Sequence, residues 1–263
     1  MTFSFGKNWQ LFLKSCNEDR IRIARESLQE FTRLQDFHGK TFVDIGCGSG
    51  LFSLGAFQLG AERIISVDVD AFSVQCCQYL HEQARCPANW EIMEGSVLDE
   101  KFLYRLGVFD IVYSWGVLHH TGNMWQAIRN AANLVKKGGL YYIAIYNKMG
   151  GSIGSDFWLK IKKVYNFGPG FLRPILEFFY TAALLLREVV RGRNPMGYIR
   201  NYQKERGMNL ATDVKDWLGG YPYEFASVDD IKTFMKTNFP EFQLINLKTT
   251  GSIGNNWFLF RRD

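Results

Sequence analysis

The sequence predicts a doubly wound α/β fold in which parallel strands alternate with helices. Three observations lead to this prediction. A glycine-rich turn directly follows a short apolar strand in residues 41–50, strand-like and helix-like runs then alternate up to residue 147, and two further strand-like runs close the chain. Such alternation favours a parallel sheet with crossover helices on both faces. The chain has 263 residues, enough for one large domain, and its hydrophobic content of 47% supports a substantial core.

The elements are expected in the following order. Residues 10–37 carry apolar side chains among charges with helical spacing, and we interpret residues 1–39 as an N-terminal helical lid. Strands are expected at 42–45, 63–67, 90–93, 109–114 and 140–145, with helices at 51–59, 71–85 and 124–135. Gly60 ends the first of these helices, and Lys136-Lys137-Gly138-Gly139 ends the last.

The alternation stops at Asn147 and resumes near Ser227, where a helix begins with a pattern similar to a capping box. Strands are then expected at 243–247 and 257–260. We therefore assign residues 40–147 and 225–263 to the core and residues 148–224 to an inserted, mostly helical cap. An insertion after the fifth strand lies over the carboxyl ends of the strands, where ligands bind in open α/β sheets. The cap is expected to bind the substrate.

The stretch 173–191 is a candidate long helix, with Gly192 just past its end. Only residues 178–186 of it lack charge, whereas a bilayer span needs roughly 20 apolar residues. No transmembrane segment is predicted. Burial within the cap is the expectation, and a dimer contact or a peripheral membrane contact is the alternative.

Composition narrows the class of partner. The net charge of +5 is confined to residues 148–224, which hold 12 Lys/Arg and 7 Asp/Glu, and this distribution disfavours a nucleic-acid partner. The five cysteines form no C-x-x-C pair, and the four histidines have no zinc-like spacing, so no metal is expected. Reduced cysteines and the lack of a signal-peptide pattern predict a cytoplasmic protein.

The glycine-rich turn is the most informative motif. Residues 43–50 read Val-Asp-Ile-Gly-Cys-Gly-Ser-Gly, so an acid precedes three glycines at a strand-to-helix turn. Glycines let the backbone turn sharply and approach a ligand, and the helix start offers free N–H groups. The third glycine comes one residue earlier than in the dinucleotide fingerprint G-x-G-x-x-G. A carboxylate at Asp44 suits a ligand with an ammonium group better than a pyrophosphate.

This segment resembles motif I of the class I (Rossmann-like) S-adenosylmethionine-dependent methyltransferases of the small-molecule type. The resemblance implies a seven-stranded, mostly parallel sheet with an antiparallel last strand, and S-adenosyl-L-methionine as the cofactor. The residues expected to bind the cofactor are Trp9, Asp44, Gly46, Cys47, Gly48, Gly50, Asp68, Val69, Ser96, Val97, Ser114 and Trp115. Trp9 is included because an aromatic face attracts a sulfonium; packing against the first helix is its alternative role.

Two loops carry the remaining cofactor assignments. Asp68 ends the second strand about 20 residues past the turn, where a carboxylate can accept hydrogen bonds from both ribose hydroxyls. Its alternative role is to cap the next helix, although Asp70 is the better placed cap. The loop 94–99 meets the adenine in the family, and the acid that many members carry is replaced by Ser96. Ser96 and the backbone of Val97 are therefore expected to bind the adenine, unless the side chain of Asp99 extends to it. Asp99 is equally suited to cap the following helix.

The run 109–121 resembles the motif that follows the fourth strand in small-molecule methyltransferases. Ser114 and Trp115 would flank the methionine end of the cofactor, and His119 and His120 would lie under the transferring methyl. Histidine is a natural general base because its pKa lies near neutrality. Structural packing is the alternative role for either histidine. Tyr146 ends the fifth strand, where it either lines the methyl path or packs.

The candidate substrate-binding residues lie at the cap and its junctions. Residues 206–224 resemble a block found in methyltransferases of sugar and natural-product pathways. Acids there could bind hydroxyls, and arginines could bind a phosphate or carboxylate. The residues assigned to the substrate are Asn147, Arg200, Arg206, Asp213, Tyr221 and Glu224.

The predicted function is methyl transfer to a small-molecule hydroxyl or amine, such as a sugar, a natural product or a lipid-linked metabolite. An RNA or protein methyltransferase is the main alternative, since the cap is positively charged. A nicotinamide oxidoreductase is opposed by the glycine spacing and the closing hairpin. A binding subunit without catalysis is opposed by the intact set of Asp44, the glycines and Asp68.

Overall fold

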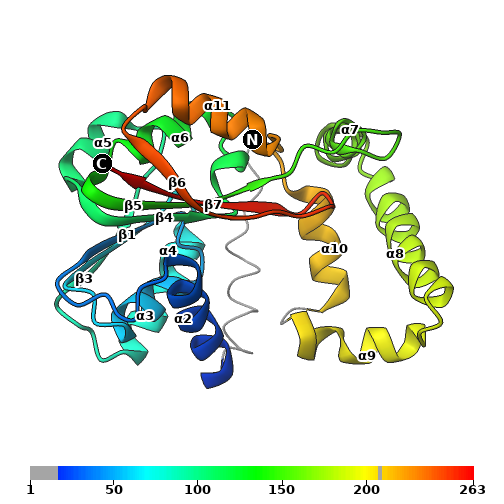
Figure 1. Cartoon of the computed structure of the whole chain (residues 1–263). Helices are drawn as coiled ribbons and strands as arrows, with labels where there is room; N and C mark the ends of the chain where they lie inside the picture. The colour runs from blue at the N-terminus through cyan, green and yellow to red at the C-terminus, as the bar shows by residue number, and fades with distance from the viewer. Residues whose placement is uncertain (1–16, 207–208) are drawn as a thin grey trace.

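The computed structural model describes residues 17–206 and 209–263 and contains one seven-stranded sheet (Figure 1). The strand order is β3-β2-β1-β4-β5-β7-β6. The strands are β1 (Thr41–Ile45), β2 (Arg63–Asp68), β3 (Trp90–Glu94), β4 (Phe109–Trp115), β5 (Val135–Tyr146), β6 (Phe242–Lys248) and β7 (Asn255–Arg262). The first five pair in parallel, and β7 runs antiparallel to both β5 and β6. The predicted fold class is confirmed.

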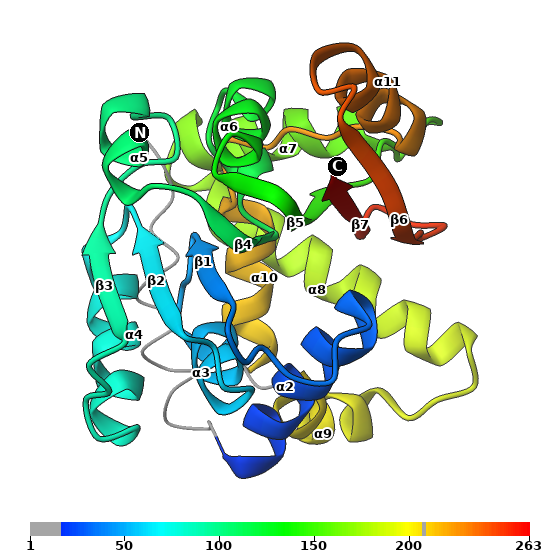
Figure 2. The ribbon, with the colours of Figure 1, turned by 60° about the vertical axis from the view of Figure 1, so that its left-hand side comes forward.

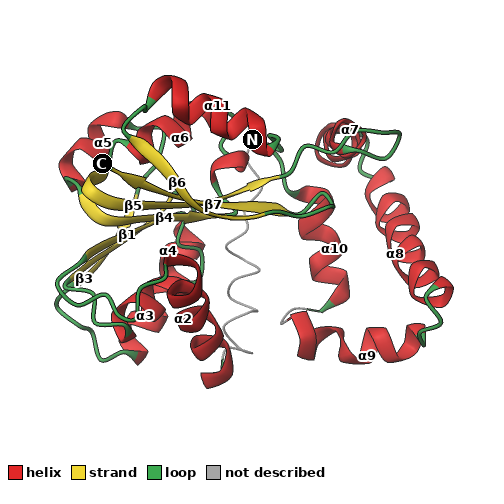
Figure 3. Ribbon diagram, in the orientation of Figure 1, coloured by secondary structure: helices red, strands yellow, loops and turns green. Residues whose placement is uncertain are grey.

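Helices cover both faces of the sheet, as Figure 3 shows. One face packs against α2 (Glu18–Thr32), α3 (Leu51–Gln58) and α4 (Ala71–Gln83), and the other packs against α5 (Glu100–Leu106), α6 (Met124–Ala132) and α11 (Val228–Asn238). Because both faces are buried, the central strands are nearly all apolar. The strand order reverses between β1 and β4, and such a switch point is where doubly wound sheets bind ligands.

The predicted end of one helix is wrong. The helix expected at 124–135 ends at Ala132, and β5 begins at Val135 rather than at residue 140. Val135 is fully buried and pairs with Phe109, so its apolar side chain is used by the sheet. The run Lys136-Lys137-Gly138-Gly139, expected to stop a helix, lies inside β5 at a shift of register.

The N-terminal region is described from residue 17 onward. Asn17 caps α2 by accepting a hydrogen bond from the backbone N–H of Arg20 at 3.1 Å. Phe31 of this helix stacks on Tyr142 of β5 with ring centroids 4.5 Å apart. The described part of the predicted lid therefore packs on the sheet. The rest of that lid, including Trp9, lies outside the described residues.

The inserted segment forms a helical cap beside the sheet, seen from two directions in Figures 1 and 2. It consists of α7 (Ser155–Phe167), α8 (Leu172–Val190), α9 (Pro195–Arg206) and α10 (Leu210–Gly219). These helices share a small core of their own, formed by Tyr165, Tyr202, Leu210, Val214 and Leu218. Within the described residues, no helix combines the length and apolar character that a membrane crossing requires.

The expectation that α8 is buried within the cap is wrong. The helix has the expected length, but Glu188 is its one buried residue. Phe178 and Phe179 are 68% and 65% exposed, and Val190 is 80% exposed. Apolar residues occur on both sides of this helix, and the cap core covers one side alone.

The two ends of the cap lie side by side. The backbone N–H of Ala226 donates to the carbonyl of Tyr146 at 3.0 Å, and the N–H of Lys148 donates to the carbonyl of Ala226 at 3.1 Å. The Asn147 side chain holds the same junction, because it donates to the carbonyls of Thr250 and Ser252 at 3.1 Å each. The chain thus leaves the core and returns to it at one place.

Candidate active site

The glycine turn joins the carboxyl ends of β1 and β2. The backbone N–H groups of Gly46 and Cys47 donate to the carbonyl of Val67 at 2.7 and 3.0 Å. The N–H of Gly48 donates to Oδ2 of Asp68 at 2.9 Å. Gly46 has a φ of +75°, and a Cβ there would lie 2.3 Å from Cγ1 of Val117. The turn therefore requires glycine both for its backbone conformation and for close contact with the loop after β4.

Asp44 lies below this turn at the end of a buried hydrogen-bond chain. Trp90 Nε1 donates to Ser66 Oγ at 2.8 Å, Ser66 Oγ donates to Ser53 Oγ at 2.7 Å, and Ser53 Oγ donates to Asp44 Oδ2 at 2.7 Å. Burial raises the pKa of Asp44 to about 7, although the Ser53 hydrogen bond opposes the shift. A cation nearby would favour the ionised carboxylate.

Asp68 faces the same turn from the end of β2. One of its carboxylate oxygens accepts from Gly48, and the other accepts from the backbone N–H of Asp70 at 2.9 Å. Each oxygen retains a second lone pair, so two hydroxyl groups could still be bound. Burial raises the pKa of Asp68. Asp70, rather than Asp68, caps α4, where it accepts from Phe72. Val69 is 67% exposed and therefore provides an apolar surface next to the carboxylate of Asp68.

The loop after β3 is held by local hydrogen bonds. Ser96 Oγ accepts from the N–H of Leu98 at 3.1 Å, and the carbonyl of Val97 accepts from Asn130 Nδ2 at 2.9 Å. Asp99 caps α5 by accepting from the N–H of Phe102 at 3.0 Å. The structure thus shows Asp99 as a helix cap.

The end of β4 supplies two of the predicted residues. Ser114 is buried, and its hydroxyl donates to the carbonyl of Ile45 at 2.8 Å, which fastens β4 to β1. Trp115 is partly exposed and lies edge-on to Trp257 of β7, with ring centroids 5.7 Å apart. Ser114 is therefore placed beside the turn, and Trp115 offers an aromatic surface at the strand end.

His119 lies in a short 3-10 helix (Leu118–His120) directly after β4. Its ring is fully buried, 3.9 Å from the ring of Tyr146 between centroids. The backbone N–H of Tyr146 lies 3.3 Å from Nδ1, and a hydrogen bond between the ring and the backbone of Ala144 favours the protonated ring. Nε2 is buried and has no hydrogen-bond partner among residues 17–206 and 209–263. Burial holds the pKa of His119 well below its usual value of 6.5.

A hydrogen bond to the backbone fixes the tautomer of His120. Its Nδ1 lies 2.6 Å from the carbonyl of Pro222, and a carbonyl accepts, so Nδ1 carries the proton and Nε2 has the lone pair. Burial lowers the pKa of His120 to about 4, and the charge of Lys162 acts in the same direction. Burial therefore favours the neutral form of both histidines at pH 7.

The sequence analysis missed Lys162, a buried residue of α7. Its ammonium donates to the carbonyl of Trp217 and lies 4.1 Å above the Trp217 ring and 4.9 Å above the Tyr223 ring. Burial lowers the pKa of Lys162 to about 7. In the sequence it belongs to Lys160-Ile161-Lys162-Lys163, which suggests a basic surface. A signal was present, because Trp158, Ile161 and Tyr165 share its helical face.

Aromatic rings enclose the place where β5 meets the cap. Tyr146 lies 6.0 Å from Trp217 and 5.2 Å from Tyr223, measured between ring centroids. Burial raises the pKa of Tyr146 well above its usual range. The cap residues Trp217 and Tyr223 and the core residues His119, His120 and Tyr146 thus form one aromatic cluster.

Among the predicted substrate residues, Glu224 lies beside the histidines. Its N–H donates to the carbonyl of His119 at 2.9 Å, and its carboxylate accepts from the N–H of Met124 at 3.1 Å. Glu224 thereby caps α6, since the Asn123 side chain makes no capping bond. Tyr221 lies edge-on to Phe167 with ring centroids 5.1 Å apart. Asn147 ties the cap junction described above.

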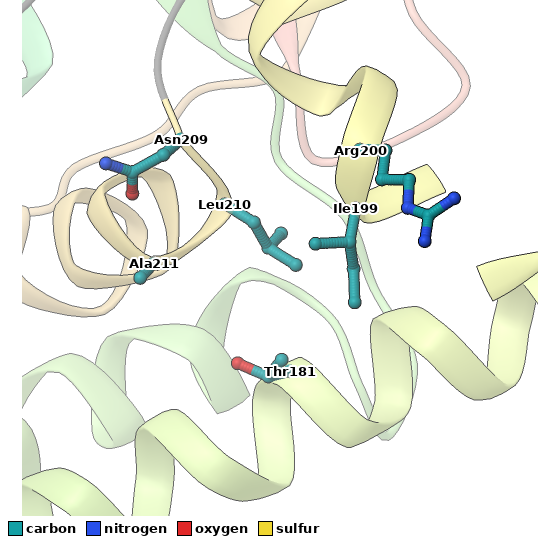
Figure 4. A pocket seen from close by; sticks show the side chains of 6 residues that line it. All are labelled: Thr181, Ile199, Arg200, Asn209, Leu210 and Ala211. Carbon is teal, nitrogen blue, oxygen red and sulfur yellow. The ribbon is translucent and has the colours of Figure 1, made fainter. Parts of the chain in front are cut away.

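The other substrate assignments lie further along the cap. Asp213 accepts a hydrogen bond from Tyr202. Arg200 borders a cavity of about 520 Å³ between α8, α9 and α10, lined by Thr181, Ile199, Arg200, Asn209, Leu210 and Ala211. In Figure 4 the side chains of Ile199 and Leu210 point toward each other, whereas the Arg200 guanidinium points away from them.

This cavity is not at the aromatic cluster. Leu210 begins α10 and Trp217 lies seven residues further on, about 10 Å along the helix axis. The structure therefore does not bring Arg200 to the histidines. Arg206 ends α9, and its side chain is outside the part of the chain that is described.

Comparison with known proteins identifies the core. Residues 43–143 match the family model for the methyltransferase domain. Residues 43–143 therefore form a methyltransferase domain. The resemblance seen in the sequence is thereby confirmed. The magnesium protoporphyrin IX methyltransferase of Synechocystis PCC 6803, solved with bound SAH, has a similar fold. The two structures match with a TM-score of 0.56 and 15% sequence identity, and the match covers 98% of this chain and 96% of that one.

Curated relatives of this methyltransferase domain have diverse names. A ubiquinone biosynthesis O-methyltransferase of Pelagibacter ubique is 23% identical over 56% of this chain and 63% of its own length. A ribosomal protein L11 methyltransferase of Alteromonas mediterranea is 52% identical over 19% of this chain and 16% of its own length. An rRNA N(6)-adenosine-methyltransferase of Caenorhabditis elegans is 28% identical over 39% of this chain and 50% of its own length. In each case the chain spans less than two thirds of the relative.

Proposed function

We propose that the protein transfers a methyl group from S-adenosylmethionine to an oxygen or nitrogen atom of a small-molecule acceptor. The observation that carries the proposal is the hydrogen bond between Gly48 and Asp68. It joins the glycine turn and the carboxylate at the end of β2 into one cradle beside the point where the strand order reverses. When bound there, the cofactor supplies an electrophilic methyl group on its sulfonium.

The residues of the cradle suit this cofactor. Asp68 has lone pairs left for two ribose hydroxyls, and Val69 provides an exposed apolar surface for one face of the adenine. The backbone has a positive φ at Gly46, Gly48 and Gly50, a conformation that glycine adopts without strain and that shapes the turn beside Asp68. Asp44 suits the ammonium group of the methionine part of the cofactor. A cation beside this buried carboxyl group would lower its pKa and favour the negatively charged form.

The aromatic cluster supports a small acceptor. Its walls come from the core and from α7 and α10 of the cap, and His119 and Tyr223 are buried within it. A protein chain or a folded RNA would have to displace the cap to bring its reactive atom to the histidines. An acceptor of metabolite size would need only a small space between the cap and the core, and the cap could stay in place.

The two histidines are placed to handle the acceptor proton. Methyl transfer needs the nucleophile about 3 Å from the methyl carbon and in line with the leaving sulfur. His120 has a lone pair on Nε2, so it accepts the proton of an acceptor hydroxyl or ammonium. His119 has a buried Nε2 without a partner among the described residues, and in the tautomer with its proton on Nε2 it donates a hydrogen bond that orients the acceptor. Tyr146 holds both rings by contact.

The first test is calorimetric titration of the full chain with S-adenosylhomocysteine, and with NADH as the control ligand. Heat with the first ligand and none with the second is expected. Next, the protein and S-adenosylmethionine are incubated separately with a fraction of cell metabolites, with total RNA and with ribosomal protein. Release of S-adenosylhomocysteine with the metabolite fraction is expected. Release with RNA or protein alone would replace a small acceptor by a macromolecular one.

A further inference from the structure

The outward side of α8 is an apolar surface that packs against neither the sheet core nor the other cap helices. We name this surface the α8 outer face; its members are Phe171, Ile175, Phe178, Phe179, Leu186 and Val190. Successive members are four, three, one, seven and four residues apart, and at about 100° per residue these spacings keep them on one side of the helix. The helix has 19 residues and extends for about 28 Å. Figure 1 shows it at the edge of the molecule furthest from the sheet.

The opposite, inner side of the same helix already packs against the rest of the cap. Leu176, Tyr180 and Leu184 already pack into the cap core with α7 and α10. The helix is therefore anchored through its inner side, and Phe178, Phe179 and Leu186 on the outer side leave more than half of their surface exposed. An exposed apolar surface of this extent marks an interaction site in most proteins.

The charges around the α8 outer face have one sign. The two acids of α8 are turned inward: Glu177 accepts from the hydroxyl of Tyr165 at 2.6 Å, and Glu188 is buried. The cations remain at the surface. Arg173, near the start of the helix, turns its guanidinium to α7, where it donates to the carbonyls of Tyr165 and Asn166 at 3.1 and 3.4 Å. The side chains of Arg191 and Arg193 are 54% and 70% exposed just after the end of the helix.

One carboxylate does not balance the cations at the end of α8. Glu188 lies 3.0 Å from Arg187, 3.7 Å from Arg191 and 3.5 Å from Arg193, so three guanidinium groups share a single negative charge. The surplus is positive and is exposed next to Val190. The α8 outer face thus combines an apolar surface with exposed cations at the C-terminal end of the helix, which is the pattern of helices that lie in the interface of an anionic membrane.

We propose that the α8 outer face docks on the surface of an anionic phospholipid membrane. The helix lies parallel to the membrane plane, with its phenylalanines at the boundary of the acyl chains and its arginines among the phosphates. A second copy of this chain is the competing occupant. In a parallel pair of helices, Arg191 and Arg193 would face the same residues of the partner, and in an antiparallel pair they would face Arg173, with no exposed acid of α8 to pair with them in either case. Docking does not depend on which acceptor the core methylates.

The test is flotation of the full chain with vesicles. One set contains phosphatidylglycerol mixed with phosphatidylcholine, and the other contains phosphatidylcholine alone. The wild-type chain should float with the anionic vesicles and should be released by salt. Phe178→Ser with Phe179→Ser should lower the partition coefficient by at least about tenfold. Since both side chains are exposed, thermal unfolding of this variant should match the wild type.

Two matched variants separate the apolar and charged contributions. Tyr104→Ser removes an aromatic side chain that is 88% exposed on α5 and should leave flotation unchanged. Arg191→Gln with Arg193→Gln keeps Arg187 beside Glu188 and should weaken binding to anionic vesicles and its dependence on salt. Equal flotation of the phenylalanine variant and the wild type would overturn the proposal, as would failure of the wild type to float at low salt. A dimer in light scattering that dissociates in the phenylalanine variant would assign the surface to a second copy.

Discussion

The backbone N–H of Gly48 lies 2.9 Å from Oδ2 of Asp68, which is 20 residues further along the chain. The glycine turn is therefore shaped by the same carboxylate that ends β2. Asp70 holds the other oxygen through its backbone N–H, so the carboxylate plane is fixed from both sides. A ligand that binds the free lone pairs finds the acceptors already oriented, and less conformational entropy is lost on binding.

Asp68→Asn is expected to weaken the binding of S-adenosylhomocysteine by more than about tenfold, which corresponds to ~1.4 kcal/mol. The amide nitrogen of asparagine is a donor, so the side chain cannot accept from the backbone and from both ribose hydroxyls. Calorimetric titration measures the loss. The control is Asp99→Asn, because asparagine caps a helix as well as aspartate does. Equal affinities of the two variants would contradict the role given to Asp68.

His120→Gln is expected to lower turnover by about a hundredfold or more, since a general base contributes 10²–10⁴ in rate. His119→Asn should have a smaller effect, because Oδ1 of asparagine can accept from the Tyr146 N–H in place of Nδ1. Single-turnover rates and cofactor titrations on both variants separate chemistry from binding. If the His119 variant is the slower one, the roles of the two rings are reversed.

The same histidines predict how stability depends on pH. The pKa of His120 is about 4 in the folded chain and near 6.5 in the unfolded chain, so the unfolded state binds more protons between these values. The free energy of unfolding should therefore fall as the pH is lowered from about 6.5 to about 4. Urea unfolding across this range measures the slope. The slope should be shallower in His120→Gln, and an unchanged slope would show that the ring does not titrate there.

Lys162→Met is expected to change stability in the alkaline range. The pKa of Lys162 is about 7 when folded and near 10.5 when unfolded, so the wild type should gain stability as the pH rises from about 7 toward 10. The variant lacks the buried amine and should lose this gain. Loss of the Lys162 charge should also raise the pKa of His120, which NMR of the imidazole protons can follow. Lys163→Met, at the exposed neighbouring position, is the control.

Gly50→Ala tests the packing of the turn against α4. Gly50 has a φ of +80°, and a Cβ would lie 2.6 Å from Sγ and 3.0 Å from Cα of Cys77. Gly39 has a φ of +68° with no atom within 4 Å of such a Cβ. Gly39→Ala should therefore cost about 1 kcal/mol for the backbone alone, and Gly50→Ala about 1–3 kcal/mol more. Denaturant unfolding of both variants gives the difference, which should vanish if α4 can move away.

The fold could be predicted from the sequence because its signals are local. The acid and three glycines between 44 and 50, the stop at Gly60 and the capping box at Ser227 each reflect the backbone of a few neighbouring residues. The start of β5 could not be predicted in the same way. Lys136-Lys137-Gly138-Gly139 has the composition of a helix stop, and only the pairing of Val135 with Phe109 shows that the strand has begun.

The site was harder to predict because the sequence does not show which neighbour satisfies a polar group. Glu224 could have bound a substrate hydroxyl, yet its carboxylate caps α6, more than 90 residues away in the chain. Lys162 has the residue type of a surface position and becomes a buried group only because α10 covers it. Likewise, helical periodicity identified α8 but could not decide which of its two apolar sides faces inward.

The junction at Tyr146, Lys148 and Ala226 has a consequence for how proteins of this kind diversify. Both stems of the inserted helices are tied to one spot, so a few residues of linker could close the gap if the whole insertion were excised. Natural or engineered recombination that exchanged this segment would keep the sheet and the glycine turn, but it would replace the Pro222 carbonyl that His120 contacts and the Glu224 carboxylate that caps α6. New acceptor preference would come from a graft at two neighbouring points rather than from changes dispersed through the sheet.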